Sequence, residues 1–164
     1  MTKNIEWLPE MVSVGGEWEM VLAKLYHIFD EDFRKTECTF EGRPVWWDRR
    51  ILPGARYEEG FWHLITKTDQ KTKDRLFDPR RAERLSWCCP IISNADDDAV
   101  KVWNFREARG QLRTYIWLED WDYIVILEKR RQRVSEIAFL LTAFHVGGQA
   151  TRRRLRAKYE KREA

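Results

Sequence analysis

The sequence is poor in cysteine and contains no residue pattern that would hold a metal ion. Its three cysteines are Cys38, Cys88 and Cys89, an odd number with two adjacent members. Adjacent cysteines rarely form a disulfide, and the three histidines have no ligand spacing among themselves. We therefore expect free, buried thiols, a reducing compartment such as the cytoplasm, no bound metal and no cofactor.

Long apolar runs and the common catalytic signatures are also missing. The longest strongly apolar run, IAFLLTAFHV, has about the length of a strand, whereas a membrane-spanning helix needs about 20 apolar residues. The opening MTKNIEWLPEM lacks the apolar segment of a signal peptide. No glycine-rich phosphate loop, G-x-S-x-G or H-E-x-x-H is present. We expect no membrane segment, and these templates supply no candidate site.

The sequence is rich in charge and in tryptophan. Charged residues make up 35% of 164 residues, and nine residues are tryptophan. The net charge is only +3, but residues 149–164 contain seven basic side chains and two acidic ones. Such a cluster fits an anionic partner, and it equally fits the solvated end of a helix.

Hydrophobic spacing predicts a single α+β domain over residues 1–164, with helices packed on a four-stranded or larger antiparallel sheet. We divide it into an N-terminal arm (1–16), a helix and hairpin (17–59), a sheet core (60–148) and a basic C-terminal helix (149–164). The predicted elements are a helix over 17–34, a hairpin turning at Glu41-Gly42, a strand over 60–67, a helix over 79–89 between the cap Asp78 and Pro90, and strands over 99–106, 111–119, 122–130 and 136–146.

The segment GFWHLITK provides the first candidate site. If residues 60–67 form a strand, His63 and Lys67 lie on one face, roughly 13 Å apart, so that both could line a groove. Histidine is suited to moving protons near neutral pH, and lysine to stabilising a charged phosphate. A histidine satisfied within the core is the structural alternative.

Two further strands carry candidates. Over 111–119, Arg113, Tyr115 and Trp117 share a face with Glu119, which describes either a solvated sheet face or a groove that holds phosphate and stacks a base. Over 136–146, we expect Thr142 to share a face with Leu140 and Phe144, and His145 to lie opposite. The Thr142 hydroxyl could bond backbone, or it could orient a phosphate or a histidine.

These pieces together resemble a known family. The segments are FWHLITK, RRAERLSW, YIWLEDWDYIVILEKR, AFLLTAFHV and RRRLRAKYEKR, over roughly residues 60–160. They resemble phage- and prophage-encoded members of the barnase–EndoU–colicin–RelE nuclease superfamily. The resemblance implies a small α+β domain that cleaves RNA without a metal, in several members as a toxin acting on tRNA or ribosome-bound RNA. Residues 1–59 lie outside the resemblance.

The resemblance also implies roles for individual residues. His63 would transfer a proton, Lys67 would contact phosphate, and Thr142 would orient a reacting group. Arg81 and Arg113 would stabilise charge while the 2′-hydroxyl of RNA attacks its own phosphodiester and leaves a 2′,3′-cyclic phosphate. The second proton carrier stays open among His145, Glu119 and Tyr115. Tyr115 and Trp117 would stack on a base, and the basic tail with Arg152 and Arg153 would follow the phosphate backbone.

Two other functions use the same features. A non-catalytic RNA-binding phage accessory domain needs only the basic tail and the aromatic face. A protein-interaction module, for example an antitoxin or immunity-like protein, would use the tryptophans of residues 1–59 as an interface. The partners we expect are therefore RNA and an antitoxin or immunity protein, with no membrane.

Overall fold

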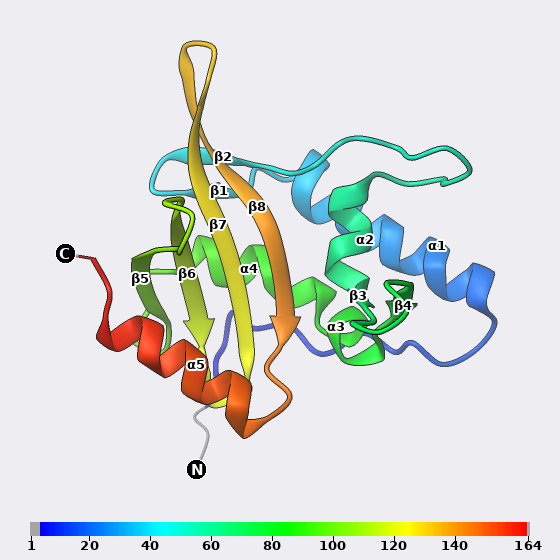
Figure 1. The fold of residues 1–164 in the computed structure, drawn as a ribbon. Helices are drawn as coiled ribbons and strands as arrows, with labels where there is room; N and C mark the ends of the chain where they lie inside the picture. Colours follow the sequence, from blue (N-terminus) through cyan, green and yellow to red (C-terminus); the bar gives the residue numbers. More distant parts are fainter. Residues whose placement is uncertain (1–3, 164) are drawn as a thin grey trace.

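The computed structural model describes residues 4–163 as an α+β fold built on one six-stranded sheet (Figure 1). The strand order is β1-β2-β8-β7-β6-β5, and a separate two-stranded sheet pairs β3 with β4. The strands are β1 (Thr39–Phe40), β2 (Arg43–Trp46), β3 (Thr66–Thr68), β4 (Arg75–Phe77), β5 (Lys101–Arg106), β6 (Leu112–Leu118), β7 (Tyr123–Gln132) and β8 (Ser135–His145). The helical elements are α1 (Trp18–Phe29), the π-helix η1 (Asp30–Lys35), α2 (Glu59–Ile65), α3 (Pro79–Glu83), the 3₁₀ turns η2 (Leu85–Trp87) and η3 (Glu119–Trp121), α4 (Cys88–Ser93) and α5 (Gln149–Glu160).

The α+β class and the four-strand meander β5–β8 are confirmed, with one correction to the sheet. Strands β5 to β8 pair antiparallel in chain order, as their short connections require. However, β2 joins the edge of β8 in the parallel direction, with Val45 opposite Ala138. The sheet is therefore mixed, because β2 and β8 are joined through a long segment that contains α2, α3 and α4 rather than by a hairpin.

Helices cover the two faces of the sheet unequally. In Figure 1, α4 crosses behind the sheet and α5 lies across its front. The larger core packs α1, α2 and α4 against the rear face around Phe29, Phe61 and Val125. A smaller core under α5 contains Trp103 and Trp117. Because α5 packs mainly over β5, the front face of β8 faces a hollow instead of a helix.

Ion pairs fasten the basic helix α5 to the sheet. Glu119 accepts from Lys101 at 2.6 Å and from Arg156 at 3.0 Å, and Lys158 donates to Glu107 at 3.0 and 3.1 Å. The helix over the C-terminal segment is confirmed. Much of its positive charge is neutralised on the side that faces the protein.

The predictions for the N-terminal third are largely confirmed. The amphipathic helix is α1 with η1, and the β1–β2 hairpin turns through Glu41 and Gly42 at φ 51° and 78°, the left-handed region that such a two-residue turn requires. The arm lies against the core through a bond from the amide of Val12 to the carbonyl of Glu83. Residues 1–3 of the arm lie outside the described residues. Of the tryptophans in this third, Trp47 is buried and Trp18 is exposed.

The strand predicted over residues 60–67 is wrong. Residues 59–65 form α2, and only Thr66–Thr68 continue as β3. Phe61, Leu64 and Ile65, all fully buried, have the i, i+3, i+4 spacing of a helix face, but in so short an apolar run this period cannot be told from strand alternation. As a result, His63 and Lys67 do not share a strand face.

Two further boundaries differ from the predictions. Asp78 caps α3 as expected, accepting from the amides of Arg80 and Arg81. The helical chain nevertheless continues past Pro90, because this residue lies in the first turn of α4, where a missing N–H costs no hydrogen bond. In β8, the pairing register with β7 shifts so that Leu140 opposes Leu127 and Thr142 opposes Ile126. This bulge at Leu141 places Leu140 and Thr142 on different faces, contrary to the prediction.

A candidate nucleic-acid groove over strand β8

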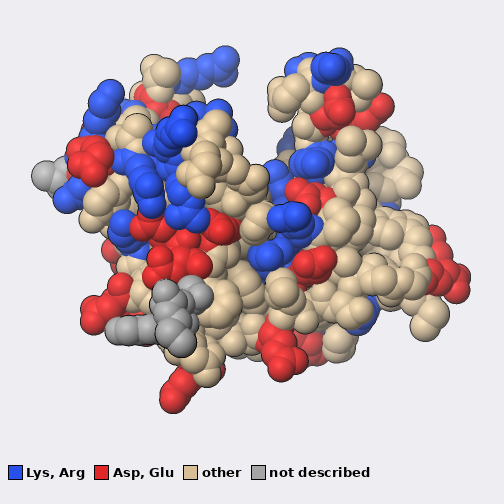
Figure 2. Space-filling view, turned by 90° about the horizontal axis from the view of Figure 1, so that it is seen from below, with Lys and Arg blue, Asp and Glu red and all other residues tan. Residues whose placement is uncertain are grey.

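Two pockets lie along the front face of β8, on the side that α5 leaves open. Figure 2 shows the hollow between the lobe that carries α5 and the lobe that carries α2, α3 and the β3–β4 hairpin, with lysine and arginine side chains on both sides. We call the pocket of about 730 Å³ beside β2 the His63 pocket, and the pocket of about 480 Å³ at the end of β8 the His145 pocket. Together they form the β8 groove.

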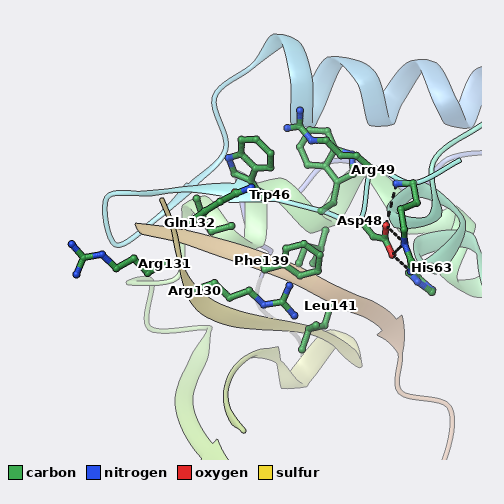
Figure 3. Close-up of a pocket in the computed structure, with 13 residues that line it drawn as sticks. Trp46, Asp48, Arg49, His63, Arg130, Arg131, Gln132, Phe139 and Leu141 are labelled. Atoms are coloured by element: carbon green, nitrogen blue, oxygen red, sulfur yellow. Dashed lines mark hydrogen bonds and ion pairs between the residues drawn. The ribbon is translucent and has the colours of Figure 1, made fainter. Parts of the chain in front are cut away.

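The His63 pocket collects aromatic and cationic side chains from four elements. Its floor is the front face of β8, its walls are the end of β2 with the following loop and the outer half of β7, and α2 supplies the histidine (Figure 3). The residues that carry its chemistry are Trp46, Asp48, Arg49, Arg50, His63, Arg130, Arg131 and Phe139.

Guanidinium groups in this pocket stack on aromatic rings. Arg49 lies 4.0 Å from the ring centroid of Trp46 and 4.2 Å from that of Trp47, and Arg130 lies 3.8 Å from the ring of Phe139. Among residues 4–163 Arg49 forms no ion pair, whereas Arg130 donates from Nε to Glu128 at 2.6 Å. A guanidinium that is packed by its face still presents its remaining N–H groups at the edge, where a phosphate can bind. The arrangement is suited to an anion that also carries flat rings.

His63 is half-buried at one end of the pocket, next to Asp48 (Figure 3). Burial lowers its pKa below the usual 6.5, and the charge of Arg75 lowers it further, against the opposing effects of Glu59 and Asp48. Asp48 is itself held ionised, because hydrogen bonds from Arg50, one of them 2.6 Å long, lower its pKa. Within residues 4–163 no protein group hydrogen bonds to the His63 ring. His63 is thus a neutral imidazole at pH 7 with both nitrogens available.

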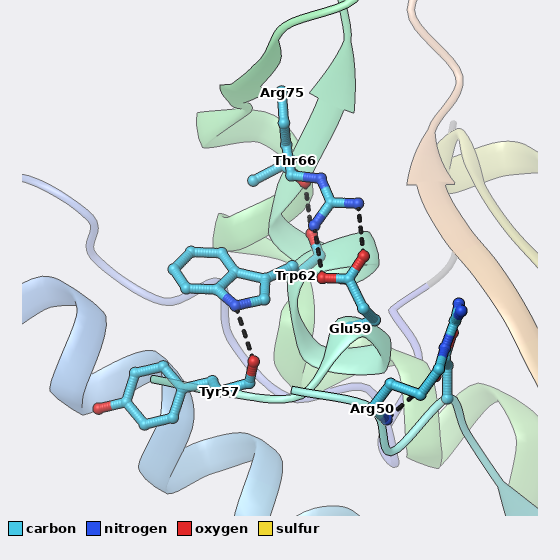
Figure 4. A network of polar contacts seen from close by, with 7 residues as sticks. Arg50, Tyr57, Glu59, Trp62, Thr66 and Arg75 are labelled. Atoms are coloured by element: carbon cyan, nitrogen blue, oxygen red, sulfur yellow. Dashed lines mark hydrogen bonds and ion pairs between the residues drawn. The ribbon is translucent and has the colours of Figure 1, made fainter. Parts of the chain in front are cut away.

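The position of His63 is set by how α2 is anchored. The amides of Glu59 and Gly60 donate to the carbonyls of Arg50 and Asp48 at 2.9 and 2.8 Å. The buried Glu59 carboxylate binds Arg75 of β4 through two bonds of 2.9 Å (Figure 4). These contacts join the start of the helix to the pocket loop and to β4, so the histidine is presented by a rigid element.

The His145 pocket is a second cationic cavity at the far end of the strand. Lys67 enters from β3, Arg80 and Arg81 from α3, and Arg154 from α5. The remaining lining residues are Asp78, Phe144, His145, Gly147 and Thr151. Burial lowers the pKa of His145, and Arg84 and Arg80 lower it further, consistent with a positive potential in this cavity.

The structure separates the four residues predicted to be catalytic. His63 and Lys67 line different pockets, Thr142 lies on β8 between Leu141 of the first pocket and Phe144 of the second, and Arg113 lies on β6 opposite Phe105, outside the groove. The four residues therefore do not line a common pocket. The misassigned strand and the hidden bulge account for the error.

The base-stacking role predicted for Tyr115 and Trp117 is also corrected. Both rings are buried beneath α5, and Tyr115 stacks on Trp103 at 5.1 Å. The sheet face that they share with Arg113 is covered by a helix, because α5 folds back onto β5 and β6. Burial and a hydrogen bond to Glu107 raise the pKa of Tyr115, and this side chain lines neither the His63 pocket nor the His145 pocket.

Three other predicted residues have defined contacts. Arg152 is paired with Asp122 and with Glu119, so its charge is already neutralised within the protein. The charge of Glu119 is likewise neutralised within the protein, because its carboxylate pairs with Lys101, Arg152 and Arg156. Arg153 is exposed on α5. Arg81 donates to the carbonyls of His63 and Thr66 at 3.1 and 2.6 Å, and so ties α3 to α2 while it lines the His145 pocket.

Sequence reasoning missed the arginines of the His63 pocket. Arg49 and Arg50 follow β2, which carries Trp46, and Arg130 and Arg131 lie in the outer half of β7, which pairs with β8 and its Phe139. Two adjacent arginines close to aromatic residues were the signal that the sequence offered. Neighbouring residues, however, do not show that Arg49 and Arg130 line the same pocket. The parallel pairing of β2 with β8 brings them together.

Comparison with known proteins provides no relative: no family model, no curated protein and no solved structure matches this chain. Within the described residues, no group of three or more His, Cys, Asp or Glu side chains is placed to hold a metal ion. No helix in this part of the chain is both long and apolar enough to cross a membrane. The three thiols are free and buried, as predicted.

Proposed function

We propose that this chain binds single-stranded RNA in the β8 groove. The observation that carries the proposal is the pairing of stacked arginines with aromatic rings over an otherwise open strand face. Phosphates would meet Arg49, Arg130 and Lys67, and unstacked bases would meet the rings of Trp46 and Phe139. From Phe139 to His145 the strand extends roughly 20 Å, enough for several nucleotides of an extended chain.

The charge distribution favours nucleic acid over an acidic protein. Each pocket contains four lysine or arginine side chains against one carboxylate, whereas the overall net charge is only +3. Positive charge is therefore concentrated in the groove. A single strand is favoured over a duplex because paired bases hide the faces that the aromatic rings would contact.

The test is a binding titration of labelled single-stranded RNA and its duplex by fluorescence anisotropy. We expect the Arg49→Ala and Arg130→Ala variants each to lose about tenfold in affinity and to lower the slope of log K against log salt by about 1. Arg109→Ala is the matched control, because Arg109 is exposed in the β5–β6 turn and outside both pockets. An equal loss of RNA affinity in all three variants would contradict binding in the β8 groove.

A second function, metal-independent RNA cleavage, is supported by His63. A neutral imidazole facing a cation-lined pocket can accept the proton of a 2′-hydroxyl, while Arg49 and Arg130 stabilise the charged phosphorane. A proton must also reach the leaving 5′-oxygen, and His145 lies in the other pocket. The proposal of cleavage thus rests on His63. We also propose, as part of it, that the chain belongs to the nuclease superfamily that its sequence resembles.

Cleavage is tested with tRNA and a generic single strand in the presence of EDTA. We expect products with 2′,3′-cyclic phosphate ends, and a loss of at least a hundredfold in rate for His63→Ala with unchanged RNA affinity. His27→Ala on the exposed surface of α1 is the control. If the RNA binds tightly but stays intact, the cleavage proposal is wrong and the proposal of RNA binding remains.

A further inference from the structure

The His145 pocket concentrates positive charge that the protein itself does not neutralise. Its single carboxylate, Asp78, already accepts from two backbone amides at 3.0 and 3.3 Å and lies 3.5 Å from Arg81. Among residues 4–163, none of Lys67, Arg80 and Arg154 forms an ion pair. Three cations from three different elements thus line one cavity without an ion-pair partner of their own, and their combined positive potential favours an anion there.

The cavity also contains groups that would hold an anion in a fixed place. Two bonds to backbone carbonyls fix the Arg81 guanidinium, and its buried Nε lies 3.5 Å from Oδ2 of Asp78 without forming a hydrogen bond. The hydroxyl of Thr151 accepts from Arg154 at 3.0 Å, which turns that arginine along the start of α5. Arg81 is thus preorganised, and Lys67 and Arg80 are exposed side chains that can close on a ligand.

The position of the His145 pocket in the fold indicates which kind of anion it would bind. It lies where β8 ends at His145, and from there the chain turns through Gly147 into α5 (Figure 1). A strand of RNA running along β8 would end here. An internal phosphodiester has one negative charge, whereas a terminal phosphate has about −1.5 to −2 and three free oxygens.

We propose that the His145 pocket is a subsite for the terminal phosphate of a bound RNA strand, held by Lys67, Arg80, Arg81 and Arg154. This inference rests on the proposed binding of RNA in the β8 groove. The chemistry is that of a phosphate monoester, which either the 5′ or the 3′ end of a strand can provide. It assigns a substrate class, RNA with a phosphorylated end, and the end that binds sets the direction of the strand along β8.

The experiment compares three octanucleotides of one sequence, labelled on an internal base, with a 5′-phosphate, a 3′-phosphate or only hydroxyl ends. We expect one of the phosphorylated forms to bind about tenfold more tightly than the hydroxyl form, and the identity of that form gives the direction of the strand. In the Lys67→Ala/Arg154→Ala double variant this preference should fall to about one. In Arg109→Ala it should persist.

The outcomes separate this inference from the function on which it rests. Equal affinity of the wild-type protein for all three oligonucleotides would overturn the subsite and leave RNA binding intact. A preference that survives in the Lys67→Ala/Arg154→Ala variant, whose fold is checked by circular dichroism, would also overturn it. If none of the three binds, RNA binding in the groove is itself wrong, and the subsite falls with it.

Discussion

Gly60 lies directly against the side chain of Trp47, so close that a methyl group on Gly60 would be 2.7 Å from Cβ and 2.8 Å from Cδ1 of the tryptophan. Trp47 is buried, and its ring also packs edge-on against Phe29 of α1 at 5.4 Å. Helix α2 can therefore pack this closely against Trp47, directly after β2, only because residue 60 has no side chain. His63 lies one helical turn further along α2, so this contact sets its position in the pocket.

We predict that Gly60→Ala destabilises the protein, although alanine favours helices. The added methyl group must displace a buried indole or shift α2, which costs about 1–3 kcal/mol in the free energy of unfolding. Urea unfolding measures this loss. Gly15→Ala is the matched control, because nothing lies within 4 Å of its added methyl group. A Gly60→Ala protein as stable as the control would show that Trp47 can move freely.

Asp32 predicts a dependence of stability on pH. Burial, together with the nearby Glu31 charge, raises its pKa from 3.8 to about 6. Because the folded state binds this proton more tightly, Asp32 contributes stability that is fully present below pH 4 and is lost as the pH rises through 6. We expect Asp32→Asn to be more stable than wild type at pH 8 by about 1 kcal/mol, allowing for solvent screening, and the gain to vanish near pH 4.

Thermal unfolding of both proteins across pH 4–8 measures this effect. Asp98→Asn, which removes an exposed carboxylate, serves as the control and should leave the pH dependence unchanged. A constant difference between Asp32→Asn and wild type at every pH would point to packing instead of ionisation.

If His63 is the general base, cleavage depends on pH in a defined way. Burial and Arg75 lower its pKa below 6.5, so the rate should rise with pH through that lowered pKa and level off near neutrality. Kinetics of a labelled RNA at saturating protein measure this profile. The His63→Gln variant should lack the acidic limb. A limb that persists in that variant would assign the base to another residue.

The bond between Glu107 and Lys158 predicts how firmly α5 is held. Glu107 also accepts from the hydroxyl of Tyr115, and these two hydrogen bonds lower its pKa in spite of the opposing effect of burial. We expect Glu107→Gln to lower the free energy of unfolding by about 1–2 kcal/mol at pH 7. The difference should shrink as the pH falls below the ordinary pKa of glutamate, because the wild-type carboxylate then also loses its charge.

A double-mutant cycle separates the bond from other effects of the substitution. Lys158→Met keeps the aliphatic stem, and the cycle with Glu107→Gln gives the coupling of the two side chains. Glu160→Gln, an exposed position on the same helix, should leave stability within about 0.5 kcal/mol of wild type. Additive effects of Glu107 and Lys158 would show that the pair contributes nothing of its own.

Local patterns in the sequence were sufficient for most of the secondary structure. The apolar stripe of α1, the Glu41-Gly42 turn, the Asp78 cap and the alternation of β5 to β8 each depend on neighbours within a few residues. These features were predicted and are confirmed. Short connections then required the antiparallel meander. Such signals depend on backbone geometry, which is local.

The candidate site needed the tertiary structure. Residues 60–67 allow both periods, and burial of Phe61, which packs against Phe29, together with burial of Leu64 selected the helix. The bulge at Leu141, the covering of Tyr115 by α5 and the placement of Arg49 and Arg130 around one pocket all involve residues far apart in the chain. The sequence by itself determined the elements and the excess of charge and aromatic residues. Only packing between distant elements decided which of those side chains face an open groove, because exposure is a property of the assembled fold.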